Sequence, residues 1–251
     1  MQENRPESQV TAARSSSLDE VSPSLASSAT EGRDVGMQFY SLLVGCDPTD
    51  ADLTDDRDFD RHVLASVLSV AAMDGGPLTE QVGLVEQELD QLRTKCFPSA
   101  PVWPVARTAK PGSTNEDETV MVRDLLLAQR STEGEISRWL AAMIARRAME
   151  PNHLWEDLGL RQRAELSRLL TRHFAPLAAR NTKNMRWKRF IYRTLCEDDG
   201  LVMCTTPVCT QCNDFDLCFG EESGENRMAE RRREFMRDAE KHEKAAGPLT
   251  G

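Results

Sequence analysis

Several features that would place this chain in a familiar class are absent. No apolar run approaches the roughly 18 residues needed to cross a bilayer, so we expect no membrane span and no membrane partner. The first residues, MQENRPESQV, lack the basic and then apolar pattern of a secretory signal. A phosphate-binding glycine loop and a G-x-S-x-G nucleophile motif are missing too. These absences predict a cytoplasmic protein that is not an enzyme.

An excess of positive charge is also lacking. The 251 residues carry 41 acidic and 31 basic side chains, a net charge of −10. Because phosphate contacts need a basic face, this balance argues against a nucleic-acid partner. Segment 180–193 differs, since it has six basic residues and no acidic one: Arg180, Lys183, Arg186, Lys188, Arg189 and Arg193. This basic segment is either a solvated helix face or a surface that attracts an anion or an acidic partner.

Strand-like alternation is nowhere sustained, whereas helical periodicity recurs along the chain. Apolar residues at helical spacing predict about six helices, at 59–71, 78–92, 117–130, 136–144, 166–174 and 184–196. We expect the first to stop at the Gly75-Gly76-Pro77 turn and the fifth to end at Pro176. The predicted fold class is therefore all-α.

Composition divides the chain into four parts. Residues 1–36 hold eight serines and few large apolar side chains, which predicts a disordered tail. A helical domain is expected over 37–197 and a cysteine-rich loop over 198–222. A charged helix and a loose end should complete the chain over 223–251.

Four of the seven cysteines fall within fifteen residues, in the pattern C-x4-C-x2-C-x5-C: Cys204, Cys209, Cys212 and Cys218. Ordering about fifteen residues costs on the order of 15–30 kcal/mol of backbone entropy. The few apolar side chains in this loop return only roughly 6–12 kcal/mol when buried. A metal held by thiolates supplies about 10–16 kcal/mol and can close this gap. The loop is therefore predicted to bind metal.

The spacing favours an iron–sulfur unit but leaves zinc open. Structural zinc sites usually pair two C-x2-C knuckles, and this loop contains one. The opening C-x4-C-x2-C is typical of iron–sulfur proteins, although plant-type ferredoxins place their fourth cysteine far downstream. Two further functions thus stay possible from spacing alone, an iron–sulfur electron-transfer protein and a zinc-stapled interaction protein.

The segment WKRFIYRTLCE, the four-cysteine run and the surrounding DFDLCFG together resemble the C-terminal signature of the NifQ family. The likeness extends upstream through WLAAMIARRAMEPNHLWEDLGL and covers roughly residues 60–220. It implies a metallochaperone that binds a molybdenum–iron–sulfur cluster through the four cysteines and donates molybdenum to nitrogenase iron–molybdenum cofactor assembly. The implied partners are the nitrogenase cofactor scaffold complex, the nitrogenase iron protein, an iron–sulfur cluster donor and molybdate.

Two residues outside the run are candidate additional ligands, because molybdenum accepts nitrogen as well as sulfur. Cys196 can equally be a small buried hydrophobe, and His153 can be a capping or packing residue. His173 is expected to complement a helix dipole, and Cys46 and Cys96 to be structural. The basic segment can attract molybdate. The acids near the cysteines are predicted to weaken the empty site's hold on metal: Asp214, Asp216, Glu221 and Glu222.

Overall fold

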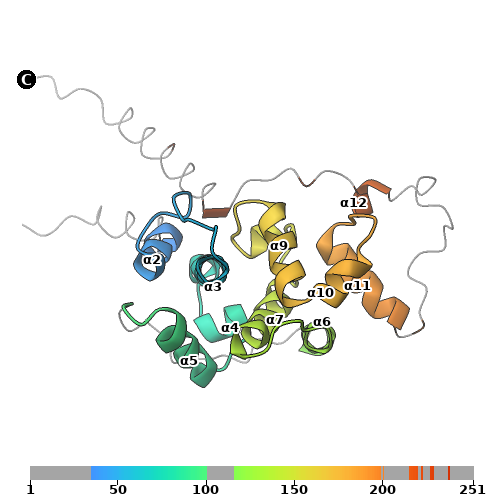
Figure 1. Cartoon of the computed structure of the whole chain (residues 1–251), viewed down its shortest axis with the longest axis horizontal. Helices are drawn as coiled ribbons and strands as arrows, with labels where there is room; N and C mark the ends of the chain where they lie inside the picture. Colours follow the sequence, from blue (N-terminus) through green and yellow to red (C-terminus); the bar gives the residue numbers. More distant parts are fainter. Residues whose placement is uncertain are drawn as a thin grey trace, which may run out of the picture.

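The computed structural model describes residues 35–100, 116–198, 200, 215–219, 222, 227, 228 and 237. Within these ranges every regular element is helical and no strand occurs, which confirms the all-α prediction (Figure 1). Residues 1–34, most of the predicted charged helix over 223–251 and Cys204, Cys209 and Cys212 lie outside them. No helix of this described part is long and apolar enough to cross a membrane.

The central element is α3 (Asp56–Asp74), whose apolar residues face neighbours on nearly every side. Asp55 caps its first turn, where its side chain accepts hydrogen bonds from the backbone N–H groups of Arg57 and Asp58. Helix α2 (Val35–Val44) packs against it and buries Tyr40 completely. Residues 35 and 36, which the prediction placed in the tail, belong to α2, a helix that the sequence analysis did not predict.

The stretch predicted as one helix over 78–92 forms two, α4 (Leu78–Val82) and α5 (Glu86–Cys96). The break falls at Gly83, which has a left-handed φ of 68°. A Cβ at Gly83 would lie 3.0 Å from Cβ of Arg146 and 3.1 Å from the carbonyl oxygen of Ala142, so the close approach also requires glycine. Val85, inside the predicted helix, is the N-cap of α5 and is 63% exposed.

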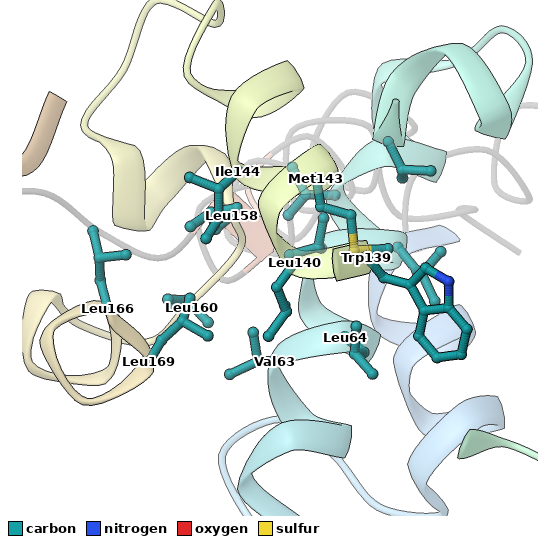
Figure 2. Close-up of a cluster of buried hydrophobic side chains, with 14 of the residues drawn as sticks. Val63, Leu64, Trp139, Leu140, Met143, Ile144, Leu158, Leu160, Leu166 and Leu169 are labelled. Carbon is teal, nitrogen blue, oxygen red and sulfur yellow. The ribbon is translucent and has the colours of Figure 1, made fainter. Parts of the chain in front are cut away.

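Helices α6 (Glu116–Ala128) and α7 (Glu135–Arg147) lie where the sequence predicts them and pack against each other. Figure 2 shows the core in which Leu140 of α7 lies next to Val63 and Leu64 of α3, while Ile144 of α7 lies next to Leu158. Leu158 and Leu160 join this core from the turn after α8 (Leu154–Asp157), and Leu166 and Leu169 join it from α9 (Arg163–His173).

The prediction that Pro176 ends the fifth helix was wrong. Helix α9 stops before Phe174, and Pro176 lies in the first turn of the next helix, α10 (Ala175–Arg180). Proline suits that position because the first helical turn needs no N–H donor and its fixed φ is already helical. The sixth predicted helix begins three residues late, as α11 (Trp187–Asp198).

Part of the predicted cysteine-rich loop is also helical. Residues 215–219 form α12 (Phe215–Phe219), which contacts α11 (Figure 1). Helix α11 in turn packs against α6. Cys218 therefore lies in a short helix beside α11.

A polar interior runs between α3 and α9. His62 lies between Glu165, at 3.2 Å from Nε2, and the Tyr40 hydroxyl, at 2.6 Å from Nδ1. His173 lies between Asp60, at 2.9 Å from Nε2, and the Thr132 hydroxyl, at 2.8 Å from Nδ1. Both histidines are buried with partners on both ring nitrogens, so His173 is a core residue rather than a surface complement to the helix dipole.

Candidate metal-cluster site

Cys218 is the motif cysteine that the structure describes. It lies in α12, is half-buried and packs against the hydrophobic core. The backbone N–H of Arg186, at the start of α11, donates to the Cys218 carbonyl oxygen at 2.9 Å. That bond fixes the last cysteine of the motif beside the basic segment. In the described part, no group of three or more His, Cys, Asp or Glu side chains is arranged to hold a metal ion.

Cys196 lies in the last turn of α11 and is half-buried. Ten residues of helix separate it from Arg186, which corresponds to about 15 Å along the axis at about 1.5 Å per residue. Since Cys218 is held at the Arg186 end, the two thiols lie at opposite ends of α11. Cys196 is therefore not a neighbour of Cys218.

His153 is the N-cap of α8, and its side chain is 29% exposed. The Glu156 carboxylate accepts the His153 backbone N–H at 2.8 Å, so the cap uses the histidine backbone rather than its ring. The ring Nδ1 lies 3.8 Å from Oε1 of Glu222, which follows Cys218 by four residues. His153 is therefore next to the downstream end of the cysteine segment.

Glu222 is an anchor of that segment. Its side chain is only 4% exposed, and Oε2 lies 3.1 Å from Nε of Arg163, an ion pair whose geometry falls short of a hydrogen bond. Glu222 is one of the acids predicted to weaken metal binding, and in the structure the charge of Arg163 lies beside its carboxylate and offsets it. Asp216 is exposed, and Asp214 and Glu221 lie outside the described residues.

A second anchor follows at residues 227 and 228. Arg227 is ion-paired with Asp74 at the end of α3, and Met228 is buried against the core. The buried guanidinium of Arg147 joins the same carboxylate at 2.7 Å. Burial alone would raise the pKa of Asp74, but hydrogen bonds from Arg227 and Arg147 outweigh it and hold that pKa below its ordinary value. The chain beyond the cysteines is thus tied back to α3.

Several residues of the basic segment form ion pairs with acidic side chains. Lys188 Nζ lies 2.5 Å from the buried Asp157 carboxylate and 2.5 Å from the Glu150 carbonyl oxygen, so it is a structural tie. Arg180 pairs with Asp198, and Arg193 pairs with Glu197. These contacts make part of the segment a salt-bridged helix face, as one interpretation predicted. Arg186 and Arg189 line a cavity.

A cavity of about 300 Å³ opens where α8 and α11 meet Glu222. Its lining residues are His153, Leu154, Arg186, Lys188, Arg189, Tyr192 and Glu222. The structure therefore brings His153 together with the basic segment, a proximity that sequence reasoning missed. No local signal reveals it, because His153 and Arg186 are separated by α9 and α10 along the chain.

The remaining cysteines match their structural prediction to different degrees. Cys96 is 8% exposed at the end of α5, and burial raises the pKa of its thiol to about 11. A thiol with that pKa stays protonated at neutral pH and is a poor metal ligand. Cys46 is half-buried after α2, and burial raises its pKa as well, followed by the negative charges of Asp50 and Asp47.

The described residues form a helical core, and a hydrogen bond to Arg186 attaches the cysteine-bearing helix α12 to the start of α11. This combination defines the class of protein. The comparisons then give the family. The family model described as NifQ matches residues 63–220. Protein NifQ homolog of Sinorhizobium fredii is 43% identical over 187 residues, which cover 71% of this chain and 78% of the relative. The chain belongs to the NifQ family.

Two further relatives agree. Protein NifQ of Rhodobacter capsulatus is 38% identical over 161 residues, covering 64% of this chain and 87% of the relative. Protein NifQ of Azotobacter vinelandii is 45% identical over 106 residues, covering 42% and 54%. No solved structure matches the chain.

Proposed function

We propose that this chain is a metallochaperone that carries a molybdenum–iron–sulfur cluster as cargo and donates molybdenum to nitrogenase iron–molybdenum cofactor assembly. Cys204, Cys209, Cys212 and Cys218 are the proposed ligands. One observation carries the proposal: the C-x4-C-x2-C-x5-C run lies inside the segment that matches the NifQ family. Soft thiolates suit iron–sulfur units and reduced molybdenum.

The position of Cys218 supports a donor. A donor must hold its cargo firmly enough to carry it and leave it accessible enough to release. Cys218 meets both requirements, since its backbone is tied to Arg186 while its side chain stays half-buried at the edge of the core. The anchors at Glu222 and Arg227 hold the chain downstream.

Between the two additional ligand candidates, the geometry favours His153. Its ring lies beside the end of the cysteine segment, whereas Cys196 lies at the far end of α11. X-ray absorption at the molybdenum edge should detect a nitrogen neighbour that His153→Gln removes. An unchanged spectrum would assign molybdenum to other ligands.

The proposed partners follow from the donor role. They are the nitrogenase cofactor scaffold complex and the nitrogenase iron protein on the receiving side, and an iron–sulfur cluster donor on the supplying side. The protein acts by transfer and is not an enzyme in this proposal.

Elemental analysis and the visible spectrum of anaerobically purified protein, from cells given molybdate, test the proposal. Brown protein containing both iron and molybdenum is expected. Cys212→Ser should lose both metals, while the matched control Cys46→Ser, outside the motif, should retain them. Iron without molybdenum would instead support an electron-transfer protein, and colourless protein with zinc would support a zinc staple; either result overturns the donor.

A further inference from the structure

We propose that the cavity between α8, α11 and Glu222 is a binding site for a tetrahedral oxyanion, and that molybdate is the anion it receives. The oxyanion site stands on the geometry of the cavity. Its assignment to molybdate rests on the proposed function, because a molybdenum donor needs a place where its metal arrives.

The lining has the donors that an oxyanion requires. Arg186 and Arg189 present guanidinium groups and His153 a ring nitrogen, while Leu154 supplies an apolar wall. The hydroxyl of Tyr192 is engaged by Glu118 and Met149, so this residue contributes its ring to the lining. Arginine forks match the oxygen pairs of tetrahedral anions better than a point charge does. A volume of about 300 Å³ leaves room for such an anion together with several waters.

Among the charged residues that line the cavity, Arg189 leaves a positive excess. Lys188 is balanced by Asp157, and Glu222 is balanced by Arg163. Arg189 is half-buried and makes no hydrogen bond or ion pair within the part of the chain that the structure describes. A guanidinium that has lost part of its water without gaining a protein partner favours an anionic ligand. This local excess lies in a protein of net charge −10.

The site also lies close to the cysteine segment. The backbone N–H of Arg186 holds the Cys218 carbonyl oxygen at 2.9 Å, and Glu222 closes the other side of the cavity. An anion held by the Arg186 and Arg189 side chains would therefore be next to the chain that carries the motif. The same half-buried setting strengthens its electrostatic binding relative to open solvent.

Isothermal titration of metal-free, full-length protein with molybdate at low ionic strength tests the site. Arg189→Gln should weaken binding about tenfold or more, because it removes a charged hydrogen-bond donor. Arg193→Gln is the matched control: it removes the same charge from the same helix, but Arg193 pairs with Glu197 and does not line the cavity. Affinity in this control should stay within about twofold of the original, since exposed charges are screened.

Several outcomes would overturn the site. One is that the unchanged protein does not bind molybdate. The other is that Arg189→Gln and Arg193→Gln lose the same amount of molybdate affinity. Thermal unfolding should show that the two variants are equally stable. Arg189→Lys, which keeps the charge and loses the fork, should bind with intermediate affinity, and Arg186→Gln should repeat the loss.

Sulfate and phosphate distinguish the anions. Tighter binding of molybdate than of either supports the assignment to molybdenum, whereas a preference for sulfate or phosphate overturns that assignment. Cys212→Ser separates the site from the proposed function. It should abolish cluster loading and leave molybdate titration unchanged. Loading without any oxyanion binding would defeat this inference alone, and oxyanion binding without cluster loading would defeat the proposed donor alone.

Discussion

The interior between α3 and α9 and the edge between α8 and α11 use similar residues in opposite ways. In the interior, His62 and His173 each have partners on both ring nitrogens and are almost fully buried. At the edge, the His153 ring is partly exposed, and its Nδ1 lies 3.8 Å from Oε1 of Glu222. Complete pairing makes a polar group structural, while incomplete pairing beside a cavity leaves it able to bind.

The arginines repeat this contrast. Arg172 donates to both carboxylate oxygens of Asp60, at 2.9 and 3.0 Å, across the α3–α9 interface. Arg189 has no such acid within the described residues and lines a cavity instead. Sequence composition does not separate these two arginines, because both lie on amphipathic helices. Their different roles depend on which helix each one faces.

The largest effect should come from breaking the interior. Asp60→Ala removes the acceptor shared by His173 and Arg172. Arg172 keeps its ion pair with Asp56, whereas the buried His173 loses its only acid among the described residues. Such a loss costs about 3–5 kcal/mol. Urea denaturation measures it, and Asp58→Ala, at an exposed position of the same helix, should cost less than about 1 kcal/mol. Equal costs would contradict the structural role of the interior.

The second effect is a fall in the free energy of unfolding at acidic pH. Burial raises the pKa values of Asp60, Asp74 and Glu165, but charged and hydrogen-bonded partners outweigh it and lower all three. Their stabilisation is therefore present above the ordinary values of 3.8 for the aspartates and 4.5 for Glu165, and is lost as the pH falls through the lower folded-state values.

Urea midpoints measured between pH 7 and pH 3 check this sign. The contribution of the three carboxylates should stay level down to about pH 5 and then fall. In Asp74→Asn the urea midpoint should fall less between pH 5 and pH 3, because one of the three groups no longer titrates. A larger fall in that variant would contradict the predicted direction of the pKa shift of Asp74.

A smaller effect is expected at the edge. Glu222→Gln removes the charge that pairs with Arg163. The guanidinium is partly exposed and keeps its bonds to the carbonyl oxygens of Asn184 and Met185, so we expect a cost of about 1 kcal/mol. Limited proteolysis should cut the C-terminal segment faster in this variant. Asp216→Asn is the control, since Asp216 is exposed, and it should leave the cleavage rate unchanged. Equal rates in both variants would remove Glu222 as an anchor.

The smallest effect should come from the salt-bridged face of α11. Arg193→Ala breaks an exposed pair with Glu197 that is worth about 0.3–0.5 kcal/mol. Thermal unfolding at low and at high salt measures the difference, which should shrink as salt screens the pair. If the stability loss were several times larger, Arg193 would be a structural residue like Lys188.

Much of the fold was predictable because it depends on local periodicity. Leu140 and Ile144 mark one face of α7, and the apolar stripe from Phe59 marks α3, so both helices were placed correctly. The errors in the predicted helix boundaries occur at glycine and proline, which can either end a helix or lie next to one. Gly83 breaks a continuous apolar pattern because α7 approaches it closely, and Pro176 begins a helix rather than ending one.

The candidate site was predictable only in part, for the same reason. The four-cysteine run is a local pattern, and the sequence alone determined both its spacing and its likeness to the NifQ family. The all-α class also follows from the sequence, because helical periodicity repeats within each short segment.

Tertiary structure alone decided which charges are structural. Lys188 and Asp157 are 31 residues apart, and Arg227 and Asp74 are 153 apart, yet each pair is in contact. No local pattern predicts such pairs, since they form only when packed helices bring distant segments together and exclude water between them. The same packing left Arg189 and His153 around a cavity beside Cys218, which is where the chemistry of this protein is proposed to begin.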